Sequence, residues 1–183
     1  MDFKTVLLTL LKNFHEQEIR YGLIGGVALG ALGIPRATID LDFLVHQDDL
    51  HKVHSIMEAT GYECRYKSEN VSQYVSLLKP LGAVDFLHAF RKASVGMLDR
   101  TKEFTLFDED TKVKVLQPDD IIGLKLQPAT NDPERLPQEY IDIEALMKHY
   151  GKSLNWKIVE EYFILFNQQE RFYKLKERYC NAG

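Results

Sequence analysis

The sequence has few of the cysteines on which small secreted and zinc-stapled folds depend. Of its 183 residues only two are cysteines, Cys64 and Cys180, and their spacing matches no zinc-binding pattern. A disulfide framework is therefore excluded. A reduced, cytoplasmic compartment fits this cysteine content best.

The sequence also lacks an excess of basic residues and a long apolar run. Its formal net charge is -4, which excludes a large basic field for gripping duplex nucleic acid but leaves room for a local basic patch. The apolar stretch over 6–11 is too short to span a bilayer, and no signal-peptide cleavage site follows it. We therefore expect a chain without a secretion signal and without a membrane partner.

The remaining composition, 45% hydrophobic and 27% charged, is that of an ordinary globular protein. Apolar periodicity, glycines and prolines locate its elements. We expect helices over 3–18, 27–32, 49–59, 91–102, 118–126, 138–149 and 155–179. We expect strands over 21–24, 38–45, 62–66, 72–78, 83–89, 104–107 and 112–116. The last two form a hairpin through Asp108, Glu109 and Asp110, and a loop is expected over 127–137.

This order of elements predicts an α/β (α+β) fold. The first 116 residues supply a mixed β-sheet flanked by helices. Residues 117–183 supply a C-terminal helical section, which could also pack as part of one integrated domain.

Two aspartates on one predicted strand form the first candidate site. Side chains at i and i+2 project from the same face, so Asp40 and Asp42 are expected about 6.6–6.8 Å apart along the strand. Like charges this close raise each other's pKa and are costly to bury. A hard divalent cation, most simply Mg²⁺, removes both costs. Alternatively, both aspartates lie on a solvent-facing edge, with Ile39, Leu41 and Phe43 packed inward.

A third acid and a glycine pair complete the candidate site. Asp85 lies in another apolar strand, and if the two strands pair, three carboxylates converge as in two-metal phosphoryl-transfer sites. Asp85 could instead bridge to Arg91 or Lys92. Gly25 and Gly26 lie between a strand and a helix, where backbone amides can approach a phosphate closely. A tight turn without a ligand explains the same pair.

These residues resemble the signature of the nucleotidyltransferase (polymerase β-like) superfamily. The stretch LIGGVA over 23–28, followed by PRATIDLD over 35–42, is similar more narrowly to the AbiEii/AbiGii toxin-type branch. A second block, PDDIIGLKL over 118–126 followed by DIEAL over 142–146, is similar to the lysine-bearing helix and later acidic motif of that branch. The resemblance covers about residues 20–148.

The resemblance implies a nucleotidyltransferase core over 1–116. It implies transfer of a nucleoside monophosphate from an NTP to a hydroxyl, with release of pyrophosphate. Asp40, Asp42 and Asp85 would hold two Mg²⁺ ions, for which Mn²⁺ can substitute, and Asp85 would also take the proton of the acceptor. The implied nucleotide-binding residues are Gly25, Gly26, Arg36, Lys125 and Asp142.

Three of these residues have ordinary alternatives. Arg36 could contact a phosphate as a donor fork or pair with Asp40. Lys125 could contact a phosphate or lie on the surface with its stem packed. Asp142 could orient Lys125 or be a helix-surface acid.

One pair of residues departs from the toxin-type pattern. Relatives usually carry a basic residue followed by Asp where this chain has Gln138 and Glu139. Glu139 keeps the negative charge, whereas Gln138 loses a cation. The exchange leaves Asp142 in place.

Several acceptors fit the sequence. The hydroxyl could belong to a tRNA end, a protein or a small molecule such as an antibiotic. The toxin-type resemblance implies tRNA or another macromolecule and an antitoxin protein as partner. A different class of function is a catalytically idle nucleotidyltransferase-like module that binds a partner, but the presence of Asp40, Asp42 and Asp85 together favours activity.

Overall fold

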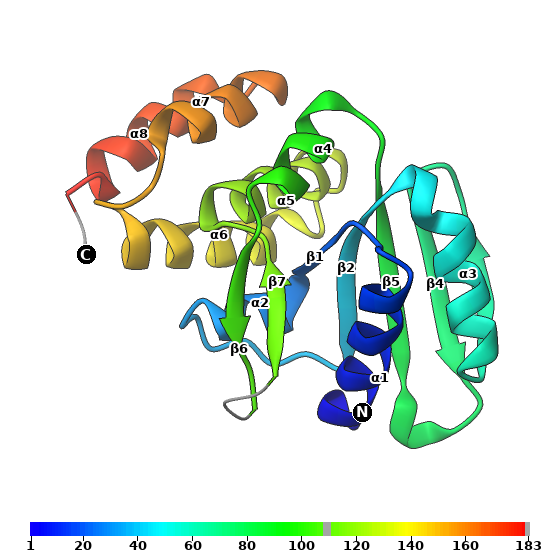
Figure 1. Ribbon diagram of the computed structural model, residues 1–183. Helices are drawn as coiled ribbons and strands as arrows, with labels where there is room; N and C mark the ends of the chain where they lie inside the picture. Colours follow the sequence, from blue (N-terminus) through cyan, green and yellow to red (C-terminus); the bar gives the residue numbers. More distant parts are fainter. Residues whose placement is uncertain (108–110, 182–183) are drawn as a thin grey trace. The chain divides into compact units, whose positions relative to one another are not determined.

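The computed structural model describes residues 1–107 and 111–181, which form two compact units, Met1–Leu116 and Gln117–Gly183 (Figure 1). The hairpin connection expected at Asp108, Glu109 and Asp110 lies outside the described residues.

The first unit is built on one seven-stranded mixed sheet in the order β3-β4-β5-β2-β1-β7-β6. Strands β2 and β5 are parallel, as are β1 and β7, and the other neighbours are antiparallel. The strands are β1 (Tyr21–Ile24), β2 (Asp40–His46), β3 (Tyr62–Lys67), β4 (Val71–Ser76), β5 (Ala83–Ala89), β6 (Lys102–Thr105) and β7 (Lys112–Val115). The predicted α/β (α+β) class is confirmed.

Helices cover this sheet. They are α1 (Phe3–Glu16), α2 (Gly25–Ala31), α3 (Leu50–Ala59) and α4 (Lys92–Asp99), with the short 3₁₀ helices η1 (Gln47–Asp49) and η2 (Lys79–Leu81). Helix α2 begins at Gly25, two residues earlier than expected, and β2 begins at Asp40, two residues later. The helix expected over 91–102 ends at Asp99, and β6 begins at Lys102.

An aromatic cluster fixes which face of the sheet is the core. Phe14 of α1 packs edge-on against Phe43 at 5.5 Å, and Phe43 stacks on Phe86 at 5.7 Å between ring centroids. Tyr74 meets Phe86 from the next strand at 5.7 Å. All four rings are buried. Because side chains alternate along a strand, the residues between these rings project from the opposite face.

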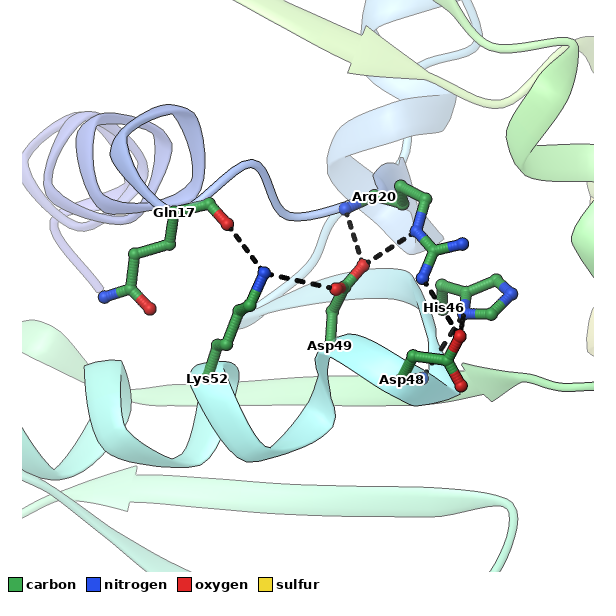
Figure 2. Close-up of polar contacts among 6 residues, drawn as sticks. All are labelled: Gln17, Arg20, His46, Asp48, Asp49 and Lys52. Carbon is green, nitrogen blue, oxygen red and sulfur yellow. Dashed lines mark hydrogen bonds and ion pairs between the residues drawn. The ribbon is translucent and has the colours of Figure 1, made fainter.

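A network of charged side chains lies at the C-terminal end of β2, where η1 and α3 follow the strand (Figure 2). The backbone amide and the Nε atom of Arg20 donate to Asp49 Oδ2 at 3.1 and 3.0 Å, and a guanidinium nitrogen of Arg20 donates to Asp48 at 3.3 Å. Lys52 donates to the carbonyl of Gln17 at 3.0 Å and lies 3.6 Å from Asp49 Oδ1. Burial raises the pKa of Asp49, but the hydrogen bonds from Arg20 outweigh it and lower that pKa overall.

The second unit is helical. Its helices are α5 (Pro118–Asn131), α6 (Leu136–Tyr150), α7 (Trp156–Leu165) and α8 (Gln169–Tyr179). The loop expected from residue 127 is wrong at its start, because α5 continues through Pro128 to Asn131, with Leu126 and Ala129 buried on either side of the proline. The single helix expected over 155–179 is two helices, with Asn167 at a φ of 55° between them.

Among the described residues, no helix combines the length and the apolar character that crossing a bilayer requires.

Candidate active site

Three aspartates meet on the face of the sheet opposite the aromatic cluster. Asp40 and Asp42 come from β2, and Asp85 comes from β5, where it is the register partner of Asp42. One carboxylate oxygen from each lies within 4.8 Å of the others, and all three residues are half-buried. Leu41 and Phe43 pack inward, as the alternative expected, but β2 is central in the sheet and Ile39 is 83% exposed, so the expected edge strand with Ile39 packed inward is wrong.

The glycine pair makes room for this cluster. Gly25 has a φ of +67°, and a Cβ atom built on it would lie 1.9 Å from Asp42 Oδ2. A Cβ atom on Gly26 would lie 2.5 Å from the Cβ atom of Thr38. A side chain at either position would displace a residue of the cluster or its neighbour. Gly25 is therefore required by the packing of Asp42, and Gly26 by the packing of Thr38.

Two neutral donors, which the sequence did not single out, hold two of the acids. Thr38 Oγ1 donates to Asp40 Oδ1 at 2.6 Å, and Gln73 Nε2 donates to Asp85 Oδ2 at 2.9 Å. Thr38 lies two residues before Asp40 and could have been noticed for that spacing. Gln73 lies on β4 as the register partner of Asp85, and nothing in the sequence places it there.

The surroundings of Asp85 suit a carboxylate that accepts protons. Burial, with the negative charge of Asp40, raises the pKa of Asp85, and the hydrogen bond from Gln73 opposes that rise. Among residues 1–107 and 111–181, Asp85 forms no ion pair with Arg91 or Lys92, so that alternative is wrong.

The cluster fits a hard divalent cation. Mg²⁺ and Mn²⁺ prefer carboxylate oxygens, and the three acids offer oxygens of this kind from two adjacent strands. A cation would also relieve the mutual repulsion of these carboxylates.

The other predicted residues come from two further segments of the chain. Arg36 is exposed in the segment between α2 and β2. In the second unit, Lys125 Nζ lies 2.6 Å from Asp142 Oδ2 and 2.9 Å from Glu139 Oε2. The side chain of Lys125 is 15% exposed, and those of Asp142 and Glu139 are 4% and 6% exposed.

The two residues that depart from the toxin-type pattern, Gln138 and Glu139, both lie at this ion cluster. Glu139 shares Lys125 with Asp142 and pairs with Arg135 as well. Gln138 Nε2 lies 3.4 Å from Asp142 Oδ1. Asp142 is buried and contacts Lys125, so it is not a helix-surface acid, and Lys125 is not a surface lysine. A phosphate contact for Lys125 stays a prediction.

Solved structures share the fold. The antibiotic-resistance factor ANT(2'')-Ia is 18% identical, with 97% of this chain and 98% of that chain covered and a TM-score of 0.60. A nucleotidyltransferase-like protein from Paracoccidioides brasiliensis is 18% identical, with coverages of 96% and 92% and a TM-score of 0.57. The lincosamide adenylyltransferase LnuA is 15% identical, with coverages of 78% and 94% and a TM-score of 0.53. The fold is therefore of the nucleotidyltransferase type.

The family follows from the sequence itself. Residues 3–175 match the family described as "Uncharacterised nucleotidyltransferase", and the chain belongs to this family. The superfamily expected from the sequence is confirmed. The narrower resemblance to the AbiEii/AbiGii branch stays a prediction. A comparison with curated proteins gave no match.

Proposed function

We propose that this protein transfers a nucleoside monophosphate from an NTP to a hydroxyl acceptor at Asp40, Asp42 and Asp85. The observation that carries the proposal is the meeting of these three carboxylates, one oxygen of each within 4.8 Å of the others, in a chain of a nucleotidyltransferase family. An acid cluster of this kind is costly for a fold unless it serves a cation.

The three aspartates are the residues that would hold divalent cations, Mg²⁺ first and Mn²⁺ as a substitute. Such cations neutralise the triphosphate and lower the pKa of the acceptor hydroxyl. Thr38 and Gln73 each hold one oxygen of an acid, Asp40 Oδ1 and Asp85 Oδ2, and in this proposal they keep the two carboxylates in place for the cations.

The transfer step makes one bond and breaks one. The acceptor oxygen forms a bond to the α-phosphorus of the NTP while the bond from that phosphorus to the bridging oxygen breaks, and pyrophosphate leaves with the electron pair. The hydroxyl proton goes to Asp85, whose raised pKa suits a general base. In this proposal Gly25, Gly26 and Arg36 lie along the triphosphate, and Lys125, oriented by Asp142, supplies a further phosphate contact.

A small molecule is the acceptor that the structural likenesses favour. ANT(2'')-Ia has been solved with adenylyl-2''-tobramycin, with 14% identity, coverages of 91% and 97% and a TM-score of 0.61, and LnuA with lincomycin. The motif resemblance to toxin-type proteins favours a second candidate, in which the acceptor is tRNA or a protein and an antitoxin binds the chain.

A thermal-shift panel tests the proposal. ATP, CTP, GTP and UTP are each added with and without Mg²⁺ to the wild type and to Asp42→Asn. A ligand at 100 times its Kd stabilises a fold by about 2.7 kcal/mol, which raises the Tm by roughly 2–4 °C at this size. We expect a Mg²⁺-dependent rise that the variant loses. No rise with any nucleotide would favour the idle binding module instead.

A further inference from the structure

The acid cluster continues as a row of side chains across the sheet. Asp42 on β2 is the register partner of Asp85 on β5, which is the partner of Gln73 on β4. Gln73 is in turn the partner of Tyr66 on β3, the edge strand. Cross-strand partners project to the same face. Tyr66 and Gln73 therefore lie on the face that carries the acids.

This face is open where the row crosses it. Along β4 and β5 the side chains alternate between buried and half-buried, and the half-buried ones share the face of Asp85. Tyr66 is 53% exposed. Among the described residues, Gln73 makes no side-chain hydrogen bond besides the one to Asp85, and the Tyr66 hydroxyl has no partner. An aromatic face, an amide oxygen and a carboxylate are thus presented in line.

The chemistry around the row is apolar and acidic. On the same face, Val71 and Leu87 are register partners on one side of the row, and Val75 lies on the other. Glu63 is the register partner of Val75, and Arg65 in the irregular stretch of β3 pairs with it at 2.9 Å. Because Arg65 matches Glu63, Asp85 is the acid that would repel an acceptor carrying phosphates here, whereas a neutral or amino-bearing acceptor would not be repelled.

We propose that the acceptor lies along this row, with Tyr66 as a specificity-determining residue that packs against its ring and Gln73 as a positioning residue beside Asp85. The acceptor class is a small polyhydroxylated ring compound, neutral or amino-substituted, such as a sugar or a cyclitol. This inference rests on the proposed nucleotidyl transfer.

Distances across a sheet support this class. Neighbouring strands lie about 4.8 Å apart, so Tyr66 and Asp85 are separated by about 10 Å across two strand spacings. One six-membered ring is shorter than this interval, so it would rest over Gln73, in the middle of the row, with one side against Tyr66 and an edge hydroxyl toward Asp85. The C–H face of such a ring packs on the aromatic ring, and a hydroxyl can donate to the Gln73 amide oxygen.

The experiment compares acceptor binding with nucleotide binding in matched variants. The probes are free monosaccharides, amino sugars, cyclitols, tobramycin and lincomycin, with a short single-stranded RNA as the contrasting arm. Binding is measured by saturation-transfer NMR in the presence of Mg²⁺ and the best nucleotide, and the thermal shift reports nucleotide binding separately. The variants are Tyr66→Thr, which keeps strand propensity, Tyr66→Phe, and Lys67→Gln on the opposite face of β3.

We expect at least one ring compound to bind. Tyr66→Thr should weaken it about tenfold, because the apolar area buried against the aromatic ring is lost, while Tyr66→Phe and Lys67→Gln stay within twofold. Nucleotide shifts should be unchanged in all three. With the bound compound as substrate, Tyr66→Thr should mainly raise KM, and Gln73→Leu should mainly lower kcat.

Three results overturn the inference. Binding of no ring compound rejects the acceptor class. Binding that is indifferent to Tyr66→Thr rejects the row, and Tyr66-dependent binding of the RNA rejects the small molecule. In each of these the wild-type nucleotide shift persists, so the proposed function stands. Loss of the nucleotide shift from the wild type removes the proposed function and this inference together.

Discussion

Acids lie near both ends of β2, and those whose partners are described here are held differently at the two ends. Past its C-terminal end, Asp48 and Asp49 are paired with Arg20, and Asp49 also with Lys52 (Figure 2). At its N-terminal end, Asp40 is held by the hydroxyl of Thr38. Asp85, beside it, is likewise held by a neutral amide. Acids that are paired with basic side chains stabilise the fold. Asp40 and Asp85, which accept hydrogen bonds from neutral donors, keep their negative charge for a ligand.

Removing the carboxylate of Asp85 should have the largest effect on activity. We expect Asp85→Asn to lower kcat/KM about 10³-fold, roughly 4 kcal/mol of barrier, because it loses both a cation ligand and the proton acceptor. Pyrophosphate release measures this. The control is Asp48→Asn, whose side chain is 65% exposed and belongs to the other cluster. Retained activity in Asp85→Asn would show that this carboxylate is not needed for nucleotidyl transfer and would contradict its proposed role.

The close approach of Gly25 to Asp42 gives the largest expected effect on stability. Gly25→Ala should cost about 2–4 kcal/mol, because it strains a left-handed backbone and displaces a carboxylate. Gly30, in the same helix, is a matched control, since a Cβ atom there meets nothing within 4 Å. Gly30→Ala should stabilise by about 0.5–1 kcal/mol. Urea unfolding measures both, and equal effects would show that the acid cluster places no demand on the turn.

The network of Asp48, Asp49, Arg20 and Lys52 should affect the free energy of unfolding but not nucleotidyl transfer. Asp49→Asn should lower the free energy of unfolding by about 1–3 kcal/mol, because it weakens the hydrogen bonds that the buried carboxylate accepts from Arg20. Asp48→Asn, in the exposed half of the cluster, should change it by less than about 0.5 kcal/mol. Urea unfolding separates them. A matched loss of nucleotidyl transfer in folded Asp49→Asn would contradict the division of roles.

The smallest effect is a pair of opposite pH dependences in the metal-free protein. The lowered pKa of Asp49 means that its stabilisation is present above the unfolded pKa near 3.8 and is lost as the pH falls through the folded value. The raised pKa of Asp85 means that the ionised form disfavours folding, so stability is gained as the pH falls through the folded value. Unfolding of each Asn variant against wild type between pH 7 and 3 should show differences of opposite slope.

Local sequence carried enough information for part of this site. The i, i+2 spacing placed Asp40 and Asp42 on one face, and the apolar run around Asp85 made it a strand residue. The neutral donors could not be found in the same way. Gln73 reaches Asp85 only through the register of β4 on β5, which is set by the packing of the whole sheet.

Element types were more predictable than their ends. Prolines usually end helices, yet α5 continues through Pro128. Burial of Leu126 and Ala129 on both sides favours the continued helix over the local preference. Conversely, the break between α7 and α8 at Asn167 lies in a stretch with no proline or glycine, so composition gave no sign of it.

The parallel pairing of β2 with β5 also determines when the acid cluster can form during folding. Asp40, Asp42 and both glycines precede α3, β3 and β4 in the chain. Asp85 joins them only when β5 pairs between β4 and β2. Such distant contacts close late in folding, because loop-closure entropy must be met first. A nascent chain that has not reached β5 holds two of the three acids but cannot form the cluster, so cation binding would report that β5 has paired with β2.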